Sequence, residues 1–212
     1  MKIDFVSDVA CPWCAVGLYS LETALQRLAG GVNVELRFQP FELNPSMPPE
    51  GEDTIQHLTK KYGSSPAQLA QGRETLRQRG ADVGFTFGER PRVWNTFDAH
   101  RLLHWAGLEG PGEKQRALKH ALLAAYHTHA QNPGAHDVLL RLAAKVGLDV
   151  ERARAILSSD EFTDEVRERE RFYQQQGINS VPAVIIDDRH LISGGQPPEV
   201  FEQALRQIAA QA

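Results

Sequence analysis

The two cysteines of the chain, Cys11 and Cys14, are separated by two residues. They stand where a predicted strand gives way to a predicted helix. A helix N-terminus stabilises negative charge because its first N–H groups have no partner within the helix, and the thiolate is the reactive form of cysteine. We therefore expect Cys11, at the helix start, to attack or accept a disulfide. Cys14, one turn further on, would resolve the mixed disulfide.

Two other interpretations of the pair remain open. A Cys-x-x-Cys pair is also half of a tetrahedral zinc site, but the pairs His100/His104 and His127/His129 do not have matching zinc-ligand spacing. Two inert, buried cysteines are the second alternative. The strand–helix–strand context favours redox chemistry over both, and we predict no bound metal. The position of Pro12 agrees with a helix start, where a missing N–H costs nothing.

A second feature is Val181-Pro182, directly before the β-branched run 183–186. The simple interpretation is a proline at the first residue of a strand. The alternative is a cis proline that presents the Val181 backbone to the sulfurs. Only about 5–6% of X-Pro bonds in folded proteins are cis, so the dipeptide alone does not decide.

The elements around these residues follow from apolar periodicity. Residues 2–6 and 32–39 alternate as strands do, and the four leucines between them repeat every three or four residues, as on one helix face: Leu18, Leu21, Leu25 and Leu28. We expect this helix to end at Gly30-Gly31. Asp8, before Cys11, is interpreted as a turn residue rather than a carboxylate acting on the thiol.

The rest of the chain divides into a helical block and a second α/β piece. From about 54 to 176 the pattern is nearly all helical, then a hairpin follows at 183–186 and 191–192, and a final helix opens at Pro197-Pro198. Neither α/β piece buries a sheet alone. The sequence therefore predicts an α/β fold in which residues 1–44 and 177–212 share one sheet, with a large all-helical insertion over residues 45–176.

The composition is that of an ordinary globular protein. The chain has 212 residues, a formal charge of −4 and 42% hydrophobic residues, which excludes disordered, collagen-like and disulfide-scaffold classes. An acidic balance argues against nucleic-acid binding. No stretch approaches the roughly 18 apolar residues that cross a bilayer, and the start at Met1 shows no secretory signal. We expect a cytoplasmic protein without nucleic-acid or membrane partners.

The combined motifs resemble one family. Residues 7–14, the helical insertion, Val181-Pro182, the Gly194-Gly195 turn and residues 95–102 look like a DsbA-family thioredoxin-fold protein, closest to the cytoplasmic FrnE-like branch. The resemblance implies a thioredoxin-like domain formed by 1–44 and 177–212. It also implies Cys11 as nucleophile, Cys14 as resolving thiol, a cis Pro182 and thiol–disulfide exchange on a disulfide- or thiol-containing protein or small molecule.

The resemblance also supplies an alternative. The 2-hydroxychromene-2-carboxylate isomerases share this fold and bind glutathione, but carry serine where this chain has Cys11. A glutathione-dependent isomerase of a small aromatic or polyketide-like substrate is therefore the second hypothesis. We expect no tightly bound cofactor, because there is no dinucleotide motif; glutathione is a candidate electron donor or ligand. The sequence leaves a monomer and a homodimer equally open.

Several residues carry two interpretations. Periplasmic relatives usually have histidine where this chain has Trp13, so we predict a less depressed Cys11 pKa and a less oxidising disulfide. Trp13 is either a substrate-facing platform or packing for the insertion. By family likeness Asn95 and His100 line the cleft. The simpler interpretations are a helix N-cap for Asn95 and, favoured here, an ordinary histidine without a charged partner for His100.

Overall fold

The central sheet has four strands in the order β2-β1-β5-β6. A computed structural model of the whole chain describes residues 1–28, 33–110 and 112–211. Strand β1 runs parallel to β2 and antiparallel to β5, and β5 pairs antiparallel with β6. The strands are β1 (Lys2–Ser7), β2 (Glu35–Pro40), β5 (Ala183–Ile186) and β6 (His190–Ser193). Segments from both ends of the chain thus share one sheet, as predicted. The expected helix end at Gly30-Gly31 lies outside the described residues.

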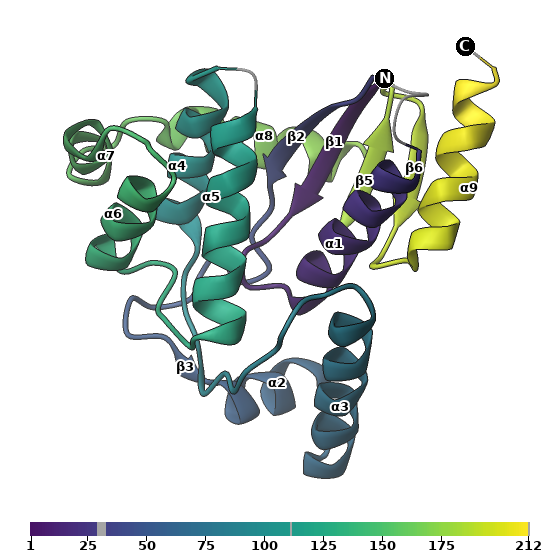
Figure 1. Cartoon of the computed structure of the whole chain (residues 1–212). Coiled ribbons are helices and arrows are strands. Elements are labelled where there is room, and N and C mark those ends of the chain that lie inside the picture. The colour runs from purple at the N-terminus through teal and green to yellow at the C-terminus, as the bar shows by residue number, and fades with distance from the viewer. Residues whose placement is uncertain (29–32, 111, 212) are drawn as a thin grey trace.

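Helices cover both faces of this sheet because successive side chains of a strand point to opposite faces and here both faces are apolar. Ile3 and Phe5 of β1 join the core formed with α1 (Pro12–Arg27) and α9 (Pro198–Ala209). Val6 belongs to a separate core on the other face, together with Tyr173 of α8 (Thr163–Gln175). Figure 1 shows α1 and α9 side by side in front of the strands, with α8 behind them. The expected α/β architecture is confirmed.

The hairpin near the C-terminus forms as expected. Asp187 and Asp188 both have positive φ, 51° and 57°, and connect β5 to β6. This backbone matches the two-residue turns that suit the twist of a hairpin, and aspartate tolerates it better than most residues.

The segment between the two α/β pieces is largely helical, but not entirely. Two short strands, β3 (Glu52–Asp53) and β4 (Arg92–Val93), pair in it. Its helices are α2 (Thr54–Tyr62), α3 (Pro66–Asp82), α4 (Phe97–Leu108), α5 (Glu113–Leu123), the π-helical turn η1 (Ala124–Thr128), α6 (His136–Lys145), α7 (Val150–Leu157) and α8. The limits 45 and 176 remain our proposal for this insertion. Within them, α8 serves the central sheet.

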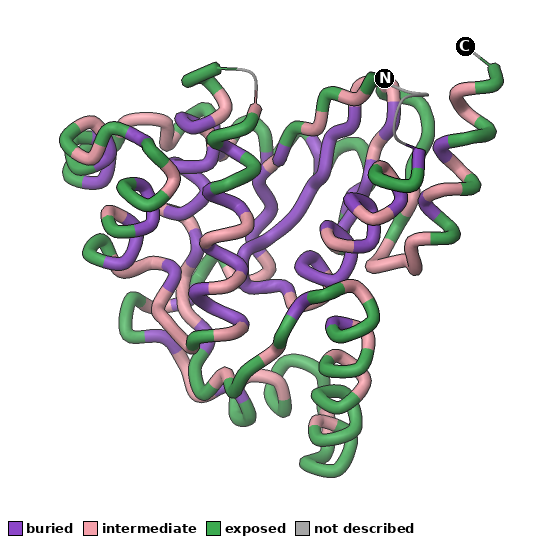
Figure 2. Tube along the Cα trace, in the orientation of Figure 1, coloured by how far each residue is buried: buried purple, intermediate pink, exposed green. Residues whose placement is uncertain are grey.

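The helices of the insertion separate into two groups in space. The group α4 to α7 has its own apolar core, centred on leucines such as Leu102, Leu118 and Leu139. Helices α2 and α3 form a second group below α1 in Figure 1, and Figure 2 shows most of α3 exposed. None of the described helices is both long enough and apolar enough to span a bilayer.

Candidate active site

The two cysteines lie at the start of α1. Cys11 is its N-cap residue and Pro12 occupies the first turn, as the sequence predicted. Both cysteines are free thiols in the structure; Cys11 is 4% exposed and Cys14 is 0% exposed. The Cys14 amide donates to the Cys11 carbonyl at 3.1 Å, which holds the two residues in one turn. The residue with access to solvent is therefore Cys11.

The surroundings shift the pKa values of the two thiols in opposite directions. A hydrogen bond from Cys14 lowers the pKa of Cys11, burial opposes this, and the backbone amides of Cys14 and Trp13 add to the lowering. Burial raises the pKa of Cys14 well above the ordinary thiol value, and the Cys11 sulfur raises it further. A thiolate forms first at Cys11, which is the order that attack followed by resolution requires.

Residues 181 and 182 form the side of the candidate site that contacts the Cys11 sulfur. The Val181–Pro182 peptide bond is cis, so this expectation is confirmed. The Cys11 thiol donates to the Val181 carbonyl at 3.5 Å. Val181 is half-buried and Pro182 is buried. The hairpin from the C-terminal piece thus meets the cysteines from the N-terminal piece, which the predicted shared sheet requires.

Asp8 is buried three residues before Cys11, whose amide donates to the Asp8 carbonyl at 3.3 Å, and its interpretation as only a turn residue was incomplete. Its buried carboxylate accepts hydrogen bonds from the amides of Ala10 at 3.0 Å and Leu43 at 2.7 Å, and from the Thr96 hydroxyl at 2.7 Å. Burial favours a raised pKa for Asp8, but the hydrogen bond and charge of His100 outweigh it and, with those amides, hold the pKa below the ordinary value. The Asp8 charge in turn raises the pKa of Cys11.

His100 has the charged partner that the sequence did not reveal. Its Nε2 lies 3.4 Å from Oδ1 of Asp8, and the ring is buried. The expectation of a histidine without a charged partner was wrong, because the partner is 92 residues away in the sequence. The N-cap residue of α4 is Thr96 rather than Asn95, and the Asn95 side chain, one residue earlier, accepts from the Phe97 amide at 2.8 Å. A substrate-binding role for Asn95 stays a prediction.

Two side chains of the insertion hold the loop before Cys11. Nε2 of His127 bonds the Val9 carbonyl at 2.9 Å, and Arg90 donates to the Ala10 carbonyl at 3.1 Å. Burial lowers the pKa of His127 well below its ordinary value, so the ring is the neutral donor that this bond needs. Sequence reasoning had weighed His127 only as a zinc ligand and had missed Arg90. The described residues contain no group of three side chains suited to a metal ion.

Trp13 is half-buried and packs against the insertion, while its role as a substrate-facing platform stays a prediction. Arg79 of α3 lies over its ring at 5.8 Å from the centroid and donates to the Gly195 carbonyl at 2.9 Å. A Cβ at Gly195 would come within 2.9 Å of the Trp13 carbonyl, so the Gly194-Gly195 turn packs closely on the Cys-Pro-Trp-Cys segment. The turn, α3 and Trp13 together form the rim of the site.

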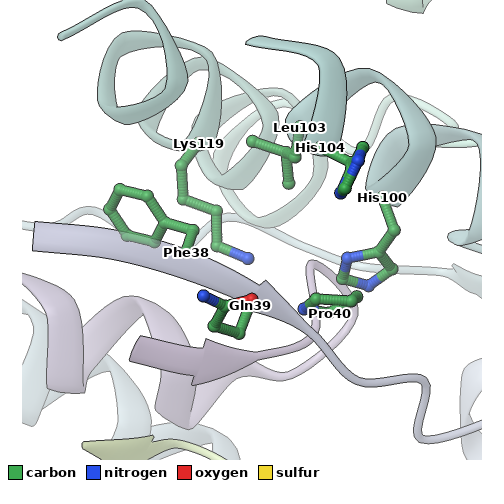
Figure 3. Close-up of a pocket in the computed structure, with 7 residues that line it drawn as sticks. All are labelled: Phe38, Gln39, Pro40, His100, Leu103, His104 and Lys119. Atoms are coloured by element: carbon green, nitrogen blue, oxygen red, sulfur yellow. The ribbon is translucent and has the colours of Figure 1, made fainter. Parts of the chain in front are cut away.

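A small cavity of about 10 Å³ lies between β2 and the helices α4 and α5. The end of β2 and helices α4 and α5 line it with Phe38, Gln39, Pro40, His100, Leu103, His104 and Lys119. Figure 3 shows Lys119 extending from α5 towards Gln39, with the His100 ring on the far side of the cavity. Nothing in the sequence pattern singled out Lys119.

Comparison with known proteins agrees with this geometry. The chain is similar to a probable DsbA oxidoreductase from Streptomyces coelicolor, SCO1869, with 36% identity, a TM-score of 0.92, and coverage of 100% of this chain and 91% of that one. An uncharacterised Bacillus subtilis protein, YwbO, is 29% identical over 209 residues, 97% of this chain and 96% of its own length. The cytosolic disulfide reductase DsbM of Pseudomonas aeruginosa, solved with GSH, shares the fold at 17% identity and a TM-score of 0.66, over 98% of each chain.

The family assignment rests on nearly the whole chain. The DSBA-like thioredoxin domain model matches residues 2–206, which include the cysteine pair, the insertion and the C-terminal hairpin. The chain belongs to the DsbA-like thioredoxin family of oxidoreductases.

Proposed function

We propose that the protein is a thiol–disulfide oxidoreductase in which Cys11 is the nucleophile and Cys14 the resolving thiol. The observation that carries this proposal is the placement of the two sulfurs: Cys11 is the N-cap of α1, retains 4% exposure and donates to the Val181 carbonyl beside the cis Pro182, while Cys14 is sealed one turn further on. The pKa directions, lowered at Cys11 and raised at Cys14, agree with it. Pro12, Trp13 and Val181 with Pro182 are the proposed substrate contacts, because they surround the accessible sulfur.

The reaction balances in two exchanges. The Cys11 thiolate attacks one sulfur of the substrate disulfide, a Cys11–substrate disulfide forms, and the first substrate thiolate leaves. Cys14 then loses its proton and attacks the Cys11 sulfur, which forms the Cys11–Cys14 disulfide and releases the second thiolate. Two electrons pass to the substrate, and the two leaving thiolates take up two protons.

The test compares the two cysteines. Reduction of a disulfide-bonded protein such as insulin by dithiothreitol is measured with the unaltered protein, Cys11→Ser and Cys14→Ser. Cys11→Ser abolishes the activity above background, and Cys14→Ser accumulates a covalent complex with substrate, visible by non-reducing electrophoresis. Full activity in Cys11→Ser would overturn the proposal.

Glutathione is the proposed electron donor. Three cationic side chains are associated with the Cys11 segment: Arg79 lies over Trp13, Arg90 donates to the Ala10 carbonyl, and burial lowers the pKa of Lys61 while the charges of Asp8 and Cys11 oppose this. A tripeptide thiol with two carboxylates suits such a rim, and DsbM was solved with GSH. The proposal includes a cytoplasmic site of action, where glutathione is abundant and disulfides are kept reduced. Reduction of the oxidised protein by glutathione, slowed by Lys61→Met and Arg79→Met, would support it; equal rates would reject it.

The second hypothesis, a glutathione-dependent isomerase, is tested with the same kinds of cysteine variants. Turnover of an aromatic isomerase substrate that survives Cys14→Ala would favour that hypothesis, because isomerisation needs no resolving thiol. Loss of all activity with Cys11→Ser and accumulation of mixed disulfide with Cys14→Ser would favour exchange chemistry.

A further inference from the structure

Lys119 of α5 carries a buried amine. Its side chain is 0% exposed, and its amine has no hydrogen-bond partner among the described residues. Transfer of an unpaired ammonium group out of water costs several kcal/mol. A methionine or leucine of similar volume would fill the same space without that cost. Packing alone therefore does not account for a lysine here.

The surroundings of the amine connect it with the cysteines. Burial lowers the pKa of Lys119, and the charges of Cys14, Asp8 and Cys11, in decreasing order, act against this. Among these groups Cys14 interacts most strongly. The lysine charge also contributes, after burial and Arg90, to lowering the pKa of His127. On the other side, Lys119 lines the cavity with His100 and His104 (Figure 3).

We propose that Lys119 takes the proton of Cys14 when Cys14 attacks the mixed disulfide. This inference rests on the proposed exchange between Cys11 and Cys14. Lys119 contacts no substrate; it is a positioning and proton-transfer residue that acts through Cys14. The resting structure shows no hydrogen bond between the amine and the sulfur, and such bonds often tighten only as the reaction proceeds.

The physical reason lies in the charge that resolution creates. Cys14 is fully buried, so loss of its proton to bulk water would leave an isolated anion in an apolar core. Burial disfavours charge on the Lys119 amine, and transfer of the Cys14 proton to that amine creates a thiolate and an ammonium of opposite charge in the same buried region. Their mutual attraction offsets part of the desolvation of both.

The other titratable groups nearby are already engaged. Asp8 accepts four side-chain and backbone donors and has a lowered pKa, which makes it a weak base. His100 lies against Asp8, and His127 is bound to the Val9 carbonyl. His104 has a pKa lowered by burial and lines the same cavity, but it is only half-buried. Lys119 is the buried base that these bonds leave available.

The proton also has a route out of the core. The cavity of about 10 Å³ beside Lys119 is about the minimum that admits one water molecule. After the Cys11–Cys14 disulfide forms, Lys119 carries the extra proton and the substrate leaves as a thiolate. The ammonium then returns its proton through the cavity to solvent, and finally to the released thiolate, so that charge and atoms balance.

The test uses a coloured aromatic disulfide, dithiobis(nitrobenzoate), mixed rapidly with the reduced full-length protein. Attack by Cys11 releases one coloured thiolate in a first phase, and attack by Cys14 releases the second in a second phase. Lys119→Met slows the second phase about tenfold or more at neutral pH, leaves the first phase unchanged within error, and the difference shrinks as the pH rises. Because a buried amine is removed, the free energy of unfolding is equal to or greater than that of the unaltered protein.

Controls separate this role from packing and from the proposed function. Leu122→Met changes the same helix without removing a base and leaves both phases unchanged; Lys119→Leu is the second uncharged variant if Lys119→Met does not fold. An unaffected second phase in either uncharged lysine variant, or equal slowing of both phases with lower stability, overturns the inference alone. A single phase in the unaltered protein, matching that of Cys14→Ser, overturns the proposed exchange and the inference with it.

Discussion

At the scale of single residues, the sequence predicted which sulfurs would react but not which groups shift their pKa values. Spacing and the helix start were enough to assign Cys11 and Cys14 different roles. The Asp8 carboxylate, by contrast, is hydrogen-bonded by Leu43, Thr96 and His100, which lie 35, 88 and 92 residues away in the sequence. No periodicity encodes contacts at such separations. The tuning of the site therefore became visible only with the folded structure.

The charge of Asp8 gives a first prediction. Asp8→Asn removes a negative charge that raises the pKa of Cys11, so the Cys11 pKa falls further. The same change weakens a buried hydrogen-bond network, and we expect a loss of about 1–3 kcal/mol in the free energy of unfolding at neutral pH. Because the pKa of Asp8 is depressed in the folded state, this difference shrinks as the pH falls through that pKa.

The measurement is thiolate ultraviolet absorption against pH, together with urea unfolding. Asp160→Asn, at an exposed position, removes the same formal charge and serves as the control. An unchanged or higher Cys11 pKa in Asp8→Asn would contradict the assignment of Asp8 as a charge acting on the sulfur.

Trp13 gives a second prediction at this scale. A histidine here would place a cationic imidazole next to Cys14, within the turn that holds both cysteines. Trp13→His therefore lowers the Cys11 pKa and makes the disulfide more oxidising, by about 30 mV for each tenfold change in the exchange equilibrium. Equilibration with glutathione buffers measures the shift. Trp13→Phe, which keeps an aromatic ring without the charge, should leave the potential near that of the unaltered protein.

At the scale of elements, periodicity predicted most helices and strands but not how they dock. The hairpin and the first strand were recognised from alternation and turn residues. The β3–β4 pair was missed because two-residue strands have no period. His127 of η1 and Arg90, just before β4, hold the loop that precedes Cys11. The sequence pattern did not predict either contact. A helix pattern predicts which side is buried, but not which carbonyl it meets.

The packing of α1 on the hairpin gives a third prediction. A Cβ at Gly17 would lie 2.9 Å from Cγ of Pro182 and 3.4 Å from Cα of Gly195. Gly17→Ala therefore pushes Pro182 away from α1, costs about 1–3 kcal/mol in the free energy of unfolding, and slows exchange with protein disulfides. Denaturant unfolding and the insulin assay measure the two effects.

The matched control is Gly72→Ala in α3, where a Cβ meets nothing within 4 Å. Alanine is the better helix former, so this variant should gain about 0.5–1 kcal/mol and keep full activity. Similar results for the two alanine variants would show that Gly17 does not set the distance between α1 and Pro182.

At the scale of the whole molecule, the insertion contributes side chains to the candidate site. The thioredoxin-like part supplies both cysteines and Pro182, while α3, α5 and η1 supply Arg79, Lys119 and His127. The sequence correctly placed the two α/β pieces in one sheet because neither buries a sheet alone. It could not show that the insertion reaches the sulfurs, because that depends on how two separate cores meet.

The bond between His127 and the Val9 carbonyl links these cores and gives the last prediction. Burial depresses the pKa of His127 in the folded protein, so the unfolded chain binds the extra proton first. Stability is therefore complete above the ordinary histidine pKa of about 6.5 and falls below it, by about 1.4 kcal/mol per pH unit at most from this residue. Urea unfolding at successive pH values from neutral to mildly acidic shows this slope, and His127→Gln, which keeps a donor for Val9, reduces it. His190→Gln, at an exposed position of β6, should leave the slope unchanged; an undiminished slope in His127→Gln would mean that the contact between the two cores does not depend on a neutral ring at this position.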